Sequence, residues 1–173
     1  MLRANLLLPI ILSFVSTSAL AAAAPTPAAD ATIYLEADQV DIDDKQGISI
    51  YVGNVKLTRG GMTITSDKMT VYRDKKDLKK VIAVGTPVHL RQVATATSKE
   101  MTGEGQRIEY DAQNGEILLN ENAKLHQESN EFTGNFIRYN VNSETVKAGK
   151  GATPGERVRV VIHPNEAPKT PTP

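Results

Sequence analysis

The sequence has no cysteine and no tryptophan, and only three of its 173 residues are phenylalanine. Disulfides therefore cannot stabilise the fold, and neither a cysteine nucleophile nor a cysteine metal site can exist. The 20 basic residues balance 20 acidic residues, so the chain lacks the positive charge typical of nucleic-acid-binding proteins. No apolar run reaches the roughly 20 residues that a membrane-spanning helix needs. We therefore expect no nucleic-acid partner and no transmembrane anchor.

Both ends of the chain differ in composition from its middle. Arg3, the apolar run 6–15 and the A-x-A cleavage site Ala19-Leu20-Ala21 are typical of a cleaved export signal. We predict a signal peptide at 1–21, a flexible Ala/Pro/Thr-rich segment at 22–31, one domain at 32–163 and a disordered Pro-rich tail at 164–173. Export without cysteine is consistent with the periplasm of a Gram-negative cell.

Apolar and polar residues alternate along almost the whole domain, which is the period of β-strands. Gly53-Asn54 and Gly85-Thr86-Pro87 are typical turn sequences that separate such stretches. The pattern predicts an all-β fold of short strands, each with one apolar and one polar face. One of these apolar sets is Ile48, Ile50 and Val52.

The sequence repeats itself when position n is compared with position n + 68. Asn54-Val55-Lys56-Leu57 corresponds to Asn122-Ala123-Lys124-Leu125, and Gly47 corresponds to Gly115. Strand pairs that cannot bury an apolar face alone form one continuous interior when they are stacked. That interior is either completely filled by side chains, as in a plain sandwich, or opened into a groove for an aliphatic ligand.

Strand-like segments open and close the domain and are candidates for exposed sheet edges. Such edges pair with other chains unless they are protected, and the charges of Arg157 and Arg159 fit protection. The alternative is pairing of the last strand of one molecule with the first strand of another, a head-to-tail contact that does not close. The edge residues of this alternative are Thr32, Ile33, Tyr34, Leu35, Val158, Val160 and Ile162.

Several motifs resemble the OstA-like family of lipopolysaccharide transport proteins, in particular its soluble periplasmic members. Ser66 stands where the family usually has alanine, and Glu121 stands where it has glycine. The resemblance extends over roughly Thr32 to Ile162. The motifs that carry it are Leu35-Glu36-Ala37-Asp38, Tyr51-Val52-Gly53-Asn54-Val55, Thr65-Ser66-Asp67-Lys68, Gly85-Thr86-Pro87, Asn122-Ala123-Lys124-Leu125 and the segment Phe132 to Tyr139.

The resemblance implies an open, twisted antiparallel β-jelly roll built from repeated strand-turn-strand units. Its apolar groove would shield the acyl chains of lipid A, and copies would pair head to tail between inner-membrane LptC and outer-membrane LptD. Ile33, Leu35, Leu90 and Tyr110 match family positions where lipid contact is expected. The full set of expected inward-facing lipid contacts is Ile33, Leu35, Val40, Ile42, Val55, Leu57, Val88, Leu90, Ile108, Tyr110 and Leu118.

Two of these expected contacts carry a geometric condition. Leu35 and Val40 differ in parity, so they face the same side only if the chain bends near Ala37-Asp38-Gln39.

No residue pattern predicts catalysis, a cofactor or a metal site. His89, His126 and His163 are isolated from one another in the sequence. The cluster of Asp41, Asp43 and Asp44 fits a solvated strand face and a turn better than a calcium site.

The function classes left open differ in what the interior holds. A lipid-carrying bridge needs an accessible interior, whereas a structural or adhesive repeat protein has a fully packed core. An enzyme acting on glycans is the weakest alternative. Lys56, Arg59 and Lys124 fit either contacts with lipid A phosphates or solubility, and we favour solubility.

Overall fold

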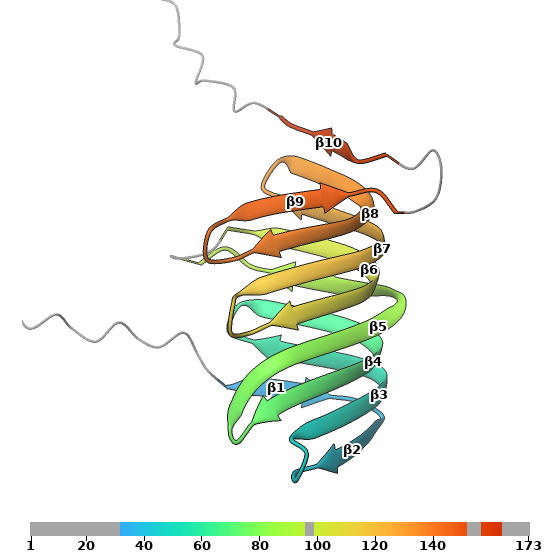
Figure 1. The fold of residues 1–173 in the computed structure, drawn as a ribbon, viewed down its shortest axis with the longest axis vertical. Coiled ribbons are helices and arrows are strands. Elements are labelled where there is room, and N and C mark those ends of the chain that lie inside the picture. Colours follow the sequence, from blue (N-terminus) through green and yellow to red (C-terminus); the bar gives the residue numbers. More distant parts are fainter. Residues whose placement is uncertain (1–31, 96–98, 152–156, 164–173) are drawn as a thin grey trace, which may run out of the picture.

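The computed structural model describes residues 32–95, 99–151 and 157–163. The predicted signal peptide, N-terminal segment and C-terminal tail lie outside these residues. The described part forms ten antiparallel strands in one sheet (Figure 1). No helix in this part is long and apolar enough to cross a membrane. The strands are β1 (Ile33–Glu36), β2 (Gln39–Asp43), β3 (Ile48–Arg59), β4 (Met62–Asp74), β5 (Asp77–Gln92), β6 (Met101–Asp111), β7 (Glu116–Gln127), β8 (Asn130–Asn140), β9 (Thr145–Gly149) and β10 (Arg159–Val161).

From β2 to β9, strands that follow each other in sequence are also hydrogen-bonded neighbours in the sheet. The order is β1-β3-β4-β5-β6-β7-β8-β10, with β2 also beside β3 and β9 also beside β8. The strands therefore stack along the long axis of the molecule, with β1 and β2 at one end and β9 and β10 at the other (Figure 1). This arrangement confirms the predicted all-β, open antiparallel sheet.

Each pair of adjacent long strands, from β3–β4 to β7–β8, has a register shift near its middle. Such bulges bend a strand, and here they divide the sheet into two halves. The β1 half contains β1, β10 and residues 55–66, 88–95, 99–105 and 123–134. The β2 half contains β2, β9 and residues 48–52, 68–84, 107–120 and 136–140. Their inner faces share one hydrophobic core.

The bulges correct the prediction of short strands separated by turns. Gly53-Asn54 lies inside the 12-residue strand β3, and Gly85-Thr86-Pro87 lies inside the 16-residue strand β5. Gly53 (φ 80°) and Asn54 (φ 45°) adopt the left-handed conformation. Glycine and asparagine accept positive φ readily, so the same residue types serve a tight turn or a bulge.

The 68-residue period appears in the backbone. The bulge between Val52 and Val55 recurs between Asn120 and Ala123. The carbonyl of Gly47 accepts a hydrogen bond from the Arg73 amide at 2.8 Å, and 68 residues later the same bond joins Gly115 and Val141 at 2.9 Å. The sequence repeat is therefore a repeat of turns and bulges as well as of apolar positions.

The acidic cluster at the start of the first repeat stabilises a turn. The Asp43 carboxylate accepts hydrogen bonds from the amides of Lys45 and Gln46, both at 3.0 Å. Asp44 pairs with Arg73 at 3.0 Å. The described residues contain no group of three or more acidic or histidine side chains arranged to hold a metal ion.

Candidate functional site

The inner face of each half carries apolar rows that cross the strands at right angles. Because directly opposed residues of paired strands share a face, the register defines these rows. The row in the β1 half, called the β1 row, consists of Leu35, Leu57, Ile64, Leu90, Gly103, Leu125, Phe132 and Val160. The row in the β2 half, called the β2 row, consists of Val40, Tyr51, Met69, Ala83, Ile108, Leu119, Ile137 and Ala148.

The two rows pack against each other in the middle of the stack. Leu57, Ile64, Leu119 and Leu125 have no exposed surface. A Cβ added at Gly103 would lie 2.7 Å from a methyl carbon of Leu119. Side chains therefore fill the interior between the two halves at this level.

At the two ends of the stack the same rows are uncovered. Val40 and Ile42 on β2 are 54% and 53% exposed although they lie on the inner face. At the opposite end, Val160 on β10 is 46% exposed. In the described part of the chain, β1 and β2 pair only with β3, and β9 and β10 pair only with β8. Apolar rows and strand edges thus reach the surface together at each end.

The structure places most of the expected inward positions on the inner face. The bend required between Leu35 and Val40 is present, because the Asp38 amide donates to the Gly53 carbonyl at 3.0 Å and Asn54 donates to the Asp38 carboxylate at 2.9 Å. The inward-facing residues of the expected set are Ile33, Leu35, Val40, Ile42, Val55, Leu57, Val88, Leu90, Ile108 and Tyr110.

Leu118 was expected to face inward, and this expectation is wrong. Leu118 lies opposite Glu109 and Arg138 on the outer face, whereas its neighbours Ile117 and Leu119 are buried. Three consecutive apolar residues carry no alternation, so the sequence does not reveal which parity faces the core.

The apolar set Ile48, Ile50 and Val52 also lies on the outer face. The hairpin register places Ser49 opposite Val71 and Tyr51 opposite Met69, so Ser49 and Tyr51 face inward. The Ser49 hydroxyl is buried and accepts a hydrogen bond from Arg73 at 3.4 Å. A polar residue with a partner therefore occupies a core position here.

Ser66 is a second buried polar residue on the inner face. It lies opposite Val55, beside the bulge of β4. Its hydroxyl has no hydrogen-bond partner within the described ranges.

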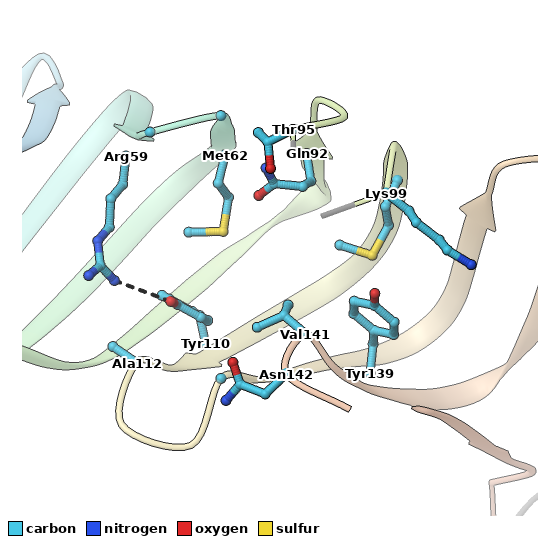
Figure 2. Close-up of a pocket in the computed structure, with 14 residues that line it drawn as sticks. Arg59, Met62, Gln92, Thr95, Lys99, Tyr110, Ala112, Tyr139, Val141 and Asn142 are labelled. Atoms are coloured by element: carbon cyan, nitrogen blue, oxygen red, sulfur yellow. Dashed lines mark hydrogen bonds between the residues drawn. The ribbon is translucent and has the colours of Figure 1, made fainter. Parts of the chain in front are cut away.

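A cavity of about 510 Å³ opens between the two halves on the side opposite the bulges. The β1 half contributes the turn at Gly60-Gly61 and the side chains of Arg59 and Met62, and the β2 half contributes Tyr110. Figure 2 shows Arg59 and Lys99 on opposite sides of this cavity, which we call the mouth. The remaining lining residues are Gln92, Thr95, Met101, Ala112, Gly115, Tyr139, Val141 and Asn142.

Polar contacts cross the mouth from one half to the other. Arg59 donates a hydrogen bond to the Tyr110 hydroxyl at 3.2 Å (Figure 2). Gln127 donates to the Tyr139 hydroxyl at 3.0 Å, and burial raises the pKa of Tyr139 above its ordinary value. These contacts join the two halves at the side of the interior opposite the bulges.

Lys99 adds an ion-pair contact across the mouth. It pairs with Glu144 at 3.4 Å and with Glu128 at 3.6 Å. The hydrogen bond with Glu144 and the charge of Glu128 raise the pKa of Lys99. The positive charge of Lys99 is therefore already balanced by carboxylates.

Sequence reasoning missed the mouth because its residues lie near strand ends in different repeats. Met62, Met101 and Tyr139 are buried there, and single methionines or tyrosines in alternating segments do not distinguish a mouth from a core. Of the mouth residues, the sequence had singled out Tyr110 and Arg59.

The outer face is polar and carries charge pairs across strands. Glu109 pairs with Lys80 on β5 and with Arg107 on its own strand. Burial opposes ionisation, but the hydrogen bonds from Lys80 and Arg107 outweigh it and lower the pKa of Glu109. Lys124 likewise pairs with Glu104 at 3.4 Å.

Comparison with known proteins gives consistent matches over most of the chain. A family model described as LptA/(LptD N-terminal domain) LPS transport protein matches residues 34–145. The lipopolysaccharide export system protein LptH of Pseudomonas aeruginosa is 33% identical over 141 residues, which cover 78% of this chain and 80% of that protein. The lipopolysaccharide export system protein LptA of Escherichia coli strain K12 is 28% identical over 157 residues, covering 87% of this chain and 83% of that protein.

A solved structure has the same fold. The crystal structure of LptH, described as the LptA homologous periplasmic component of the conserved lipopolysaccharide transport device from Pseudomonas aeruginosa, superimposes with a TM-score of 0.72 at 30% sequence identity. The match covers 79% of this chain and 100% of that chain.

Proposed function

The chain belongs to the LptA/LptD N-terminal domain family of lipopolysaccharide (LPS) transport proteins, and from this premise we propose how it takes part in transport. It is a periplasmic component of LPS transport, and it is a transport protein rather than an enzyme. Its inner face holds the acyl chains of lipid A while the saccharide remains in water. Copies of the chain pair end to end and connect LptC at the inner membrane to LptD at the outer membrane.

One observation carries this proposal: apolar inner rows cross every strand and remain uncovered at both ends. Each methylene removed from water contributes about 0.8 kcal/mol, so a lipid with several acyl chains needs continuous shielding. Rows of aliphatic side chains supply that shielding without fixing a particular atom of the lipid, which suits movement along the rows.

The packed middle of the interior sets the route of entry. Because side chains fill the space between Gly103 and Leu119, acyl chains enter where the halves part, at the mouth and at the two ends. The contacts of Arg59 with Tyr110 and of Gln127 with Tyr139 separate locally when a chain passes.

End-to-end pairing follows from the arrangement of the halves. Strands β1 and β10 both belong to the β1 half, and β2 and β9 both belong to the β2 half. Pairing of β10 with the β1 of another copy, with Val160 opposite Leu35, would therefore continue the β1 row across the junction.

Site-specific photo-crosslinking tests the lipid path. A photoreactive phenylalanine analogue replaces Leu35 or Tyr110 on the inner face, and Tyr34 or Leu118 on the outer face as matched controls. We expect LPS adducts at the two inner positions and none at the two outer positions. Folded protein without adducts at any position would refute the lipid path and favour a structural protein with a filled core.

Sedimentation velocity tests the end pairing. Val160→Asp places a charge at the end of the β1 row and is expected to weaken concentration-dependent association. Val84→Asp makes the same change at an exposed valine on the outer face of the central strand β5, and association should be retained. Equal association of the two variants would contradict pairing through β10.

A further inference from the structure

Arg59 differs from the other basic residues that the sequence singled out. Lys56 lies opposite Glu36 and Thr65 on the outer face, and Lys124 is paired with Glu104. Arg59 instead lies on the inner face, opposite Ile33 and Met62. Solubility explains an outer lysine but does not explain a half-buried arginine that points into the mouth.

The charge of Arg59 has no acidic partner within residues 32–95, 99–151 and 157–163. Its hydrogen bond goes to the neutral Tyr110 hydroxyl. By contrast, Arg73, Arg107 and Arg138 each pair with a carboxylate. The described residues that line the mouth include no aspartate and no glutamate, and the other cation there, Lys99, is held by Glu128 and Glu144.

The space beside Arg59 can accept a ligand. Gly60 follows directly, and a Cβ built on it would meet no atom within 4 Å. The cavity continues from Arg59 to the buried side chains of Met62, Met101 and Tyr110. An apolar tail attached to a charged group at Arg59 would therefore lie against these three residues.

We infer that Arg59 and the Tyr110 hydroxyl bind the phosphate monoester in the headgroup of an acylated glycolipid. This assignment rests on the proposed function and names which group of LPS the mouth recognises. A guanidinium offers several N–H donors in a plane that matches phosphate oxygens, and the neighbouring phenol supplies one more donor. A phosphate is also a stronger acceptor for Arg59 than the phenol that it contacts now. The half-exposed position leaves the sugar in water while the acyl chains extend toward Met62.

Binding of two lipids by the exported protein tests this inference. The probes are bisphosphorylated lipid A and the same lipid with its phosphates removed, in identical neutral detergent micelles at fixed salt. Because hydrogen bonds to charged groups exceed neutral ones, we expect the wild type to bind the phosphorylated lipid about tenfold more tightly. Arg59→Gln should bind both lipids equally, and Arg59→Lys should keep part of the preference.

Arg91→Gln is the matched control, because it removes the same charge from the outer face of the same half. Arg91 lies opposite Thr63 and Thr102 and pairs with Glu100 at 3.8 Å. We expect this variant to keep the tenfold preference. Equal loss in Arg59→Gln and Arg91→Gln would overturn the inference, because general electrostatic attraction would then account for the preference.

Two further results separate this inference from the function on which it rests. Tight binding of both lipids by the wild type without preference would refute the phosphate site and leave the acyl-chain path intact. Binding of neither lipid would refute both. A large excess of inorganic phosphate should displace little lipid A, and full displacement would assign the site to free phosphate rather than to a lipid headgroup.

Discussion

Replacing Leu119 by alanine tests whether the interior of the stack is packed. Leu119 has no exposed surface, lies between Ile108 and Ile137 in the β2 row, and approaches Gly103 of the opposite half. Loss of a fully buried leucine side chain costs about 3 to 5 kcal/mol when the surrounding structure cannot collapse. Domains of this size are stable by about 5 to 15 kcal/mol, so the variant should fold with a much lower midpoint in urea.

Leu118→Ala is the control, since it makes the same change one residue earlier on the outer face. Leu118 is half-buried between Glu109 and Arg138, so we expect a loss of about 1 kcal/mol. Far-UV circular dichroism in urea measures both variants, with tyrosine fluorescence as a second probe. A loss below about 1 kcal/mol for Leu119→Ala would mean that the interior is not close-packed. A greater loss of stability for Leu118→Ala than for Leu119→Ala would refute the register of β7.

The remaining predictions concern one hydroxyl, one carboxylate and one glycine. Ser66→Ala should raise the free energy of unfolding by about 1 kcal/mol, because the buried hydroxyl has no partner in the described part of the chain; a lower urea midpoint would contradict this. Glu109→Gln should lower stability by about 1 kcal/mol at neutral pH. Because the folded-state pKa of Glu109 is lowered, this contribution is present above the unfolded-state pKa and lost as pH falls through the folded-state pKa, so urea midpoints of the two proteins should converge in acid. Gly103→Ala should cost about 1 to 3 kcal/mol in the same assay, since its methyl group would clash with Leu119; an unchanged midpoint would show that the halves are further apart.

Alternation in the sequence predicted the inner face after the bulges of β3 and β5, but it failed before the bulge of β3, where Ile48, Ile50 and Val52 alternate with Ser49 and Tyr51 and still face outward. Val55 and Leu57 on β3 and Val88 and Leu90 on β5 are all buried as expected. The need for a bend after Leu35 was also predictable, because two apolar sets of opposite parity cannot otherwise share a face.

Prediction failed where parity was ambiguous or where a bulge replaced a turn. Leu118 sits in a run of three apolar residues, so either face was compatible with the pattern. Gly53-Asn54 has the composition of a turn, and the choice between a turn and a bulge depends on whether the neighbouring strand continues past it. The mouth depends on contacts such as that of Arg59 with Tyr110, 51 residues apart, and no local pattern reports such a contact.

Under the proposed function, the apolar rows also determine how far one molecule can carry a lipid. The β1 row crosses eight strands, and neighbouring strands lie about 4.8 Å apart, so one chain together with its junction to the next spans about 38 Å. Where copies pair end to end, the total distance between the membranes is therefore covered in whole steps of about 38 Å. If the proposed bridge is correct, a widening of this gap by less than one step would be accommodated by tilt or twist of the stack, and a larger increase would require an additional copy.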